Sequence, residues 1–280
     1  MLRFSQTGRF RYVTIGIALI AATIPAIAAD KPADSPRLRR AHAHNDYWHE
    51  RPLFDALEQG FFSVEADVFL VAGNLLVGHD RRELTPDRTL EALYLKPLQE
   101  RISKNRGAVY PGSPTVYLLI DVKSDAGPTW AAIDRLLANY AGMLSTFRNG
   151  SFEQKAVTVV ISGNRDEESI RRQTTRYAGL DGRAADLDSE VASHLMPWVS
   201  DNWNKHFRWR GEGAMPDAER SRLQDFVRRA HARGRLVRFW GTPENETVWQ
   251  ELLEADVDLI GTDDLNRLGR FLARVEEPGE

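Results

Sequence analysis

The sequence predicts a single (β/α)8 barrel. Eight short apolar segments alternate with amphipathic helical segments, the pattern of parallel strands joined by helical crossovers. These units fill about 240 residues, which is the usual size of one such barrel. Polar residues also follow several of the strand segments, where barrel proteins carry their functional groups. A doubly wound parallel sheet is the alternative architecture.

Composition limits the classes of protein to which the chain can belong. Of 280 residues, 42% are hydrophobic and 28% are charged, which is typical of a globular domain. The formal net charge of −3 argues against a nucleic-acid partner, because such partners require a basic surface. The sequence contains no cysteine, so disulfides, thiol nucleophiles and cysteine-rich zinc sites are excluded.

The amino terminus predicts export. Three arginines precede an apolar stretch over residues 12–22, and Ala26 and Ala28 form a small-x-small cleavage pattern. We therefore expect a periplasmic or secreted protein, with an uncleaved signal anchor as the alternative. The predicted organisation is a signal peptide over 1–28, a linker over 29–37, a barrel domain over 38–275 and a disordered tail over 276–280.

The strand and helix segments can be placed along the chain in order. The predicted strands begin near Arg40, Ser63, Thr115, Ala156, Arg176, Leu195, Arg235 and Val257. Apolar residues at three- and four-residue steps predict a helix between Trp130 and Leu144. Pro216 and Gly234 mark the beginning and end of another helix, and a last helix covers residues 265–272.

The first two strands carry the first candidate site residues. His44 and Asn45 follow the first strand, with His42 two residues earlier, and Glu65 and Asp67 lie on the second strand. Residues two apart on a strand face the same side, so both carboxylates are directed at one point. Adjacent carboxylates inside a barrel repel each other, and a bound cation relieves that repulsion most simply.

Two further segments add to this group. Leu75 to Val77 predict a returning strand that places His79 above the same barrel mouth. The third strand ends in Asp121 and Lys123, which again lie two residues apart. Carboxylate oxygens favour a hard divalent ion, Mg²⁺ or Ca²⁺, and Asn45 offers a neutral oxygen. Because imidazoles exchange protons at neutral pH and Lys123 can neutralise an anion, the group suits phosphodiester cleavage.

These motifs, in this order, resemble the superfamily of barrel phosphodiesterases that includes phosphatidylinositol-specific phospholipase C, glycerophosphodiester phosphodiesterase and spider-type phospholipase D. The segments HNDY, VEADV and GTDDL resemble most the altered-inheritance-of-mitochondria subgroup. The His-Arg-Gly and Pro-Glu-Asn-Thr patterns of typical glycerophosphodiesterases are absent near His44, which leaves the substrate open.

The resemblance implies a role for each matching residue. It makes His44 and His79 the general acid and base, with His42 as the alternative to His44. It implies that Lys123 contacts the phosphate and that Trp240 lines the mouth, where Arg238 shares its face of the strand. The implied metal ligands are Glu65, Asp67, Asp121 and Asn45.

Other polar and aromatic residues are given structural interpretations. We expect Asp263 to cap the final helix, and His49, His194, His206 and His231 to be structural or surface residues. The stretch from Trp203 to Trp209 mixes aromatic and basic residues, which suits loop packing or contact with phospholipid headgroups.

The leading functional hypothesis is an exported, metal-dependent phosphoric diester hydrolase that acts on glycerophosphodiesters or phospholipid headgroups. One alternative is a barrel that binds a metal or a phosphorylated ligand without turnover. Another is a phospholipase in peripheral contact with a membrane that forms a cyclic phosphate. The sequence indicates no protein partner.

Overall fold

The computed structural model describes residues 37–276, and eight parallel strands form a closed ring within them. The ring closes because β1 pairs with β2 on one side and with β12 on the other. The strands are β1 (Leu38–Ala43), β2 (Phe61–Val71), β4 (Val116–Val122), β7 (Val157–Gly163), β9 (Ala178–Gly182), β10 (Trp198–Asn202), β11 (Leu236–Trp240) and β12 (Leu259–Thr262). This confirms the predicted (β/α)8 barrel.

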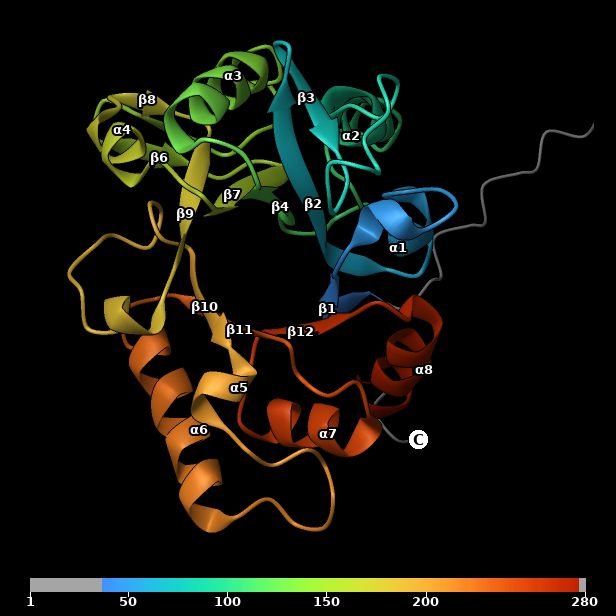
Figure 1. The fold of residues 1–280 in the computed structure, drawn as a ribbon, viewed down its shortest axis with the longest axis vertical. Coiled ribbons are helices and arrows are strands. Elements are labelled where there is room, and N and C mark those ends of the chain that lie inside the picture. Colours follow the sequence, from blue (N-terminus) through green and yellow to red (C-terminus); the bar gives the residue numbers. More distant parts are fainter. Residues whose placement is uncertain (1–36, 277–280) are drawn as a thin grey trace, which may run out of the picture. The chain divides into compact units, whose positions relative to one another are not determined.

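Helices follow the strands and lie on the outside of the ring (Figure 1). The predicted helices correspond to α3, α6 and α8, but α3 ends at Ala138, before Tyr140 and Leu144, and α8 extends to Glu276. The α-helices are α1 (Phe54–Glu58), α2 (Lys96–Lys104), α3 (Ala126–Ala138), α4 (Glu167–Arg172), α5 (Trp203–His206), α6 (Asp217–His231), α7 (Glu246–Glu254) and α8 (Leu265–Glu276). Shorter helical turns are η1 (Asp46–Trp48), η2 (Glu91–Leu95) and η3 (Ala184–Asp186).

The barrel strands are apolar on both faces because one face meets the helices and the other meets the barrel interior. The larger core lies between strands and helices. A second cluster of Leu119, Val160, Trp198 and Leu259 fills the interior. Leu119 lies opposite Glu65 in register, and Asp121, on the same face of β4, lies opposite Asp67. The apolar cluster therefore forms a floor beneath a polar mouth.

Two regions depart from the simple barrel. β3 (Asn74–Val77) pairs antiparallel with the end of β2, which confirms the predicted returning strand. The fifth predicted strand, beginning at Arg176, is divided: β8 (Thr175–Arg176) joins a separate small sheet and only β9 enters the barrel. That sheet, completed by β5 (Thr146–Arg148) and β6 (Ser151–Glu153), was not predicted, because its strands are too short to show periodicity.

The predicted signal peptide and all but the last residue of the predicted linker lie outside the described residues, as do residues 277–280 of the predicted tail. Among the residues that are described, no helix combines the length and apolar character needed to cross a bilayer.

Candidate active site

A cavity of about 530 Å³ opens at the carboxyl ends of the barrel strands. Polar side chains from strands far apart in the sequence converge on it, as expected at this end of a barrel. Nine of the predicted site residues line it: His44, Asn45, Glu65, Asp67, His79, Asp121, Lys123, Arg238 and Trp240. His42 is the exception.

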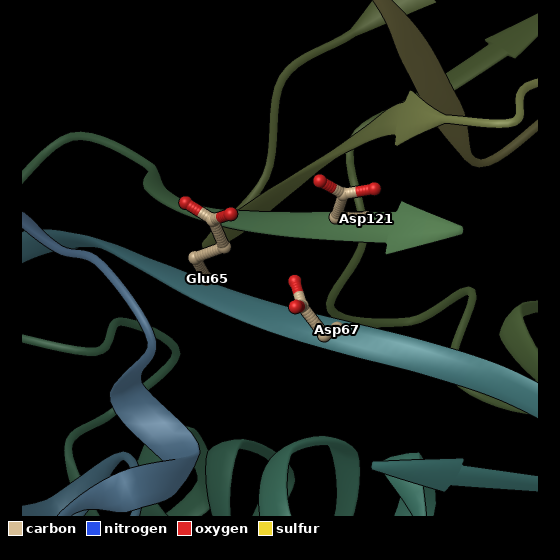
Figure 2. Close-up of side chains that lie close together, drawn as sticks. All are labelled: Glu65, Asp67 and Asp121. Atoms are coloured by element: carbon tan, nitrogen blue, oxygen red, sulfur yellow. The ribbon is translucent and has the colours of Figure 1, made fainter. Parts of the chain in front are cut away.

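Three carboxylates form the centre of one side of the cavity. Glu65 and Asp67 extend from β2, and Asp121 extends from the neighbouring position on β4 (Figure 2). One oxygen from each lies within 4.8 Å of the others. Asp67 Oδ1 and Asp121 Oδ1 are buried and have no hydrogen-bond partner among the described residues. Buried, unpaired carboxylate oxygens are costly unless something compensates for them.

The environment acts differently on each carboxylate. Burial, together with the charge of Glu65, raises the pKa of Asp67 to about 6, and burial also raises the pKa of Asp121. Lys123 Nζ offsets part of this charge at 3.0 Å from Asp121 and 3.2 Å from Asp67. Burial of Glu65 is outweighed by the nearby Arg238 and His42, which hold the pKa of Glu65 well below its usual range.

His42 does not reach the cavity, which corrects its prediction as an alternative catalytic residue. Its ring is completely buried, with Nδ1 2.7 Å from Ser63 Oγ and Nε2 3.0 Å from Glu65 Oε2. Burial and the nearby Arg238 lower the pKa of His42 to about 4, so the ring is neutral at pH 7. His42 therefore orients Glu65 from beneath the site.

His44 is held by a residue that lies far from it in the sequence. Asn45 adopts a left-handed backbone conformation (φ 47°, ψ 38°), which asparagine tolerates, and this turns the chain sharply after β1. His44 Nδ1 lies 2.7 Å from Asp263 Oδ1, just beyond β12. The prediction that Asp263 caps the final helix was wrong, because Asp264 accepts the hydrogen bond from Arg267 N instead. The position of Asp263 directly after a barrel strand was the sequence feature that could have indicated a place in the site.

His79 lines this side of the cavity and contacts the buried Tyr47. His79 Nδ1 lies 3.2 Å from Asp67 Oδ2, and its backbone N–H donates to Glu83. Tyr47 was missed by the sequence analysis, although it lies three residues after His44. Its buried hydroxyl contacts Asn45 Oδ1 at 2.6 Å, Asp67 Oδ2 at 2.8 Å and His79 Nδ1 at 3.4 Å. Tyr47 thus joins the turn after β1 to the carboxylates.

The two predicted residues on β11 differ in exposure. Arg238 is buried and its Nη2 donates to Glu65 Oε2 at 2.6 Å, whereas Trp240 is exposed at the cavity rim. Trp203 and Trp209 are buried, and Trp203 packs on Phe207 with ring centroids 4.1 Å apart. This agrees with the loop-packing interpretation and removes the feature that suggested headgroup contact.

The carboxylate cluster has the composition expected of a site for a hard divalent cation. Three carboxylates converge, two of their oxygens are buried without partners, and the neighbouring groups hold Glu65 ionised. Glu65 Oε2 is already engaged by His42 and Arg238, which leaves Oε1 as the oxygen available to an ion. The residues therefore fit Mg²⁺ or Ca²⁺.

Gly163 lets β7 pass close to Asp121. Its φ is +67°, and a Cβ built there would lie 2.0 Å from Asp121 Oδ1 and 2.5 Å from the carbonyl oxygen of Val122. We expect Gly163→Ala to displace Asp121 and to lower the affinity for Mg²⁺ at least tenfold, measured by isothermal titration calorimetry. Gly150→Ala, also at positive φ but with open space around its Cβ, is the control for backbone strain. Equal affinities in both variants would contradict the expectation.

Asp263 sets the protonation of His44. Burial lowers the pKa of His44, but the hydrogen bond to Asp263 and the charge of Glu65 outweigh it and raise that pKa overall. A raised folded pKa means that the pair stabilises the fold at acidic pH, and that this contribution is lost as the pH rises through the folded value.

We therefore expect Asp263→Asn to lower the pKa of His44. Titration of the His44 ring protons by NMR is expected to show the midpoint move to lower pH than in the wild type. An unchanged midpoint would show that Asp263 does not control His44.

The chain is similar to known proteins over most of its length. Residues 37–181 match the AIM6-like phosphodiesterase domain. The chain is 32% identical over 278 residues to altered inheritance of mitochondria protein 6 of Eremothecium gossypii, covering 85% of this chain and 70% of that protein. A homologue from Arthroderma benhamiae is also 32% identical, over 262 residues, with 80% and 81% covered.

The fold also has a counterpart among solved structures. A glycerophosphodiester phosphodiesterase from Parabacteroides distasonis aligns with a TM-score of 0.54 and 18% identity, covering 85% of this chain and 98% of that one. At this identity the likeness concerns the barrel fold alone. The domain match and the fungal relatives together show that the chain belongs to the AIM6-like phosphodiesterase domain family.

Proposed function

We propose that this chain is an exported phosphodiesterase that requires Mg²⁺ or Ca²⁺ and acts on glycerophosphodiesters or phospholipid headgroups. One observation carries the proposal. Two imidazoles, each with Nδ1 against a carboxylate, line the same cavity as a cluster of three carboxylates with unpaired buried oxygens. A site that only binds a ligand has no need for two oriented proton carriers.

The chain's own residues would divide the chemistry between them. Glu65, Asp67 and Asp121, with Asn45, would hold the ion. When bound, the ion would supply positive charge to stabilise the phosphoryl oxygens in the transition state. Lys123 and Arg238 add positive charge beside the carboxylates.

Proton transfer falls to the two histidines. Because Nδ1 of each ring faces a carboxylate, Nε2 is the nitrogen left for exchange with the substrate. One imidazole takes the proton from the attacking oxygen, which is that of water or of a substrate hydroxyl. A new P–O bond forms while the bond to the leaving oxygen breaks, and the other imidazole gives that oxygen a proton. Attack by an internal hydroxyl yields a cyclic phosphate.

The direct test is release of p-nitrophenol from bis(p-nitrophenyl) phosphate. The full chain is treated with EDTA and assayed alone and after addition of Mg²⁺, Ca²⁺ or Mn²⁺. We expect activity that EDTA abolishes and at least one ion restores. A folded protein that binds the ion but shows no turnover with this ester or with a panel of glycerophosphodiesters would favour the alternative, a non-catalytic binding barrel.

Export is a separate part of the proposal and rests on the amino-terminal sequence pattern. It predicts that the protein recovered from the periplasm or medium of an expressing bacterium begins at Ala29, which amino-terminal sequencing would determine. Recovery of the uncleaved chain in the membrane fraction would instead support the signal-anchor alternative.

A further inference from the structure

Beside the carboxylate cluster, cationic side chains also line the cavity. Three basic residues face the cavity: Arg183, which directly precedes η3, Lys205 on α5 and Arg238 on β11. The Ser162 hydroxyl and the Asn164 amide line the cavity with them. We call these five residues the cationic lobe. Only Arg238 has a role in the function proposed above.

Two buried carboxylates lie beside the lobe, and Asp201 lines the cavity with it. Asp181 is 1% exposed and accepts hydrogen bonds from Ser162 Oγ at 2.7 Å, Ser200 Oγ at 2.7 Å and Arg183 Nη1 at 2.6 Å. Asp201 accepts from its neighbour's backbone N–H at 2.7 Å and from Lys205 Nζ at 3.1 Å, and its other oxygen contacts His206 Nε2 at 3.1 Å. These oxygens are therefore committed to the protein.

The three basic side chains, in contrast, have N–H donors that are not paired with an acceptor among the described residues. Lys205 is 63% exposed and has three N–H groups but one carboxylate partner. Arg238 is 3% exposed, donates through Nη2 to Glu65, and has a buried Nε with no partner among the described residues. Arg183 makes its contacts through Nη1 and Nη2 and has no Nε contact within the described part of the chain. The lobe thus offers more donors than its surroundings accept.

We propose that the cationic lobe binds a second phosphate group of the substrate, so that the preferred substrate is a phosphodiester whose headgroup carries an additional phosphate. This rests on the proposed function, because it specifies which phosphodiester occupies the same cavity. Arginine and lysine donors match phosphate oxygens, and a cavity of about 530 Å³ has room for two such groups.

The first test compares two synthetic p-nitrophenyl phosphodiesters. Their second ester group is a propyl chain that ends either in a hydroxyl or in a phosphate. For the wild type we expect kcat/KM to be at least tenfold higher with the phosphate-ended compound. We expect this ratio to fall to about one in Lys205→Gln and in Arg183→Gln, and to persist in Lys104→Gln, an exposed lysine in the last turn of α2.

A wild-type ratio near one, or an unchanged ratio in both lobe variants, would overturn the proposal. Arg183→Gln removes a partner of the buried Asp181 and can lower stability, so circular dichroism accompanies it. Lys205→Gln alters an exposed side chain and gives the decisive result if Arg183→Gln does not fold.

A second measurement does not depend on turnover. Isothermal titration calorimetry with 3-hydroxypropyl phosphate is carried out on the EDTA-treated full chain, because a monoester tests the lobe without ester cleavage. We expect Lys205→Gln to weaken binding at least tenfold and Lys104→Gln to leave it unchanged. If binding depends on the lobe but neither diester is turned over, the proposed phosphodiesterase activity is refuted and the proposed phosphate binding by the cationic lobe stands. If the diesters are turned over but neither binding nor the kcat/KM ratio depends on the lobe, only the proposed phosphate binding by the cationic lobe is refuted.

Discussion

Replacement of either histidine that lines the cavity is expected to abolish most phosphodiesterase activity while leaving the fold intact. His44→Gln and His79→Gln each remove a proton carrier whose Nδ1 is held by a carboxylate. Loss of one general acid or base costs about 10²- to 10⁴-fold in rate. We therefore expect kcat on bis(p-nitrophenyl) phosphate to fall at least a hundredfold in each variant, with a smaller change in KM.

His231→Gln is the matched control for this experiment. His231 lies on α6, where its Nε2 is 2.8 Å from Asp258, and it does not line the cavity. Its replacement is expected to leave kcat unchanged. Wild-type turnover in either cavity variant would contradict the proposed mechanism, because the remaining imidazole cannot serve as both acid and base in one step.

The second large effect expected is ion-dependent stability. In the metal-free protein the carboxylate cluster opposes folding at neutral pH, because the pKa of Asp67 is raised to about 6 and that of Asp121 is raised as well. Sites with raised carboxyl pKa values favour the protonated folded state. Their contribution to the stability of the fold is therefore lost as the pH rises from 3.8, the ordinary pKa of an aspartate, toward 6.

A divalent ion reverses this balance because it binds the ionised carboxylates only in the folded state. At a hundredfold excess of ion over its dissociation constant, we expect a stabilisation of about 2.7 kcal/mol, seen as a rise in Tm. Asp121→Asn is expected to be at least as stable as the wild type in EDTA at pH 8, but to lose the rise in Tm with Mg²⁺ or Ca²⁺.

Asp217→Asn, which alters a fully exposed carboxylate on α6, controls for the change of charge and is expected to respond to ions like the wild type. An Asp121→Asn protein that is stabilised by ions as strongly as the wild type would show that the cluster does not hold the ion.

Much of this site could be predicted because the barrel converts sequence order into spatial order. Glu65 and Asp67 lie two apart on one strand, and parallel pairing places Asp121 beside them. Contacts that form only because the last strand pairs with the first could not be predicted in this way. Asp263 follows the last strand, and nothing near it in the sequence indicates that it faces His44.

Hydrogen-bond competition also escapes sequence analysis. Glu65 was predicted as a metal ligand, but the sequence does not show that His42 and Arg238 occupy one of its oxygens. Likewise, an aromatic residue such as Tyr47 is usually read as core, and its ring is indeed buried. Only the contacts of the Tyr47 hydroxyl with Asn45 and Asp67 in the structure show that the residue belongs to the polar network of the site.

The contact between His44 and Asp263 joins residues 219 positions apart in the chain. During synthesis the three carboxylate residues have all been made once residue 121 is added, whereas Asp263, the partner of His44, is made much later. A nascent chain, or one truncated before β12, would carry every predicted ion ligand and both histidines yet leave His44 unanchored. Such a chain is expected to remain latent, so that proton transfer begins only when the ring has closed.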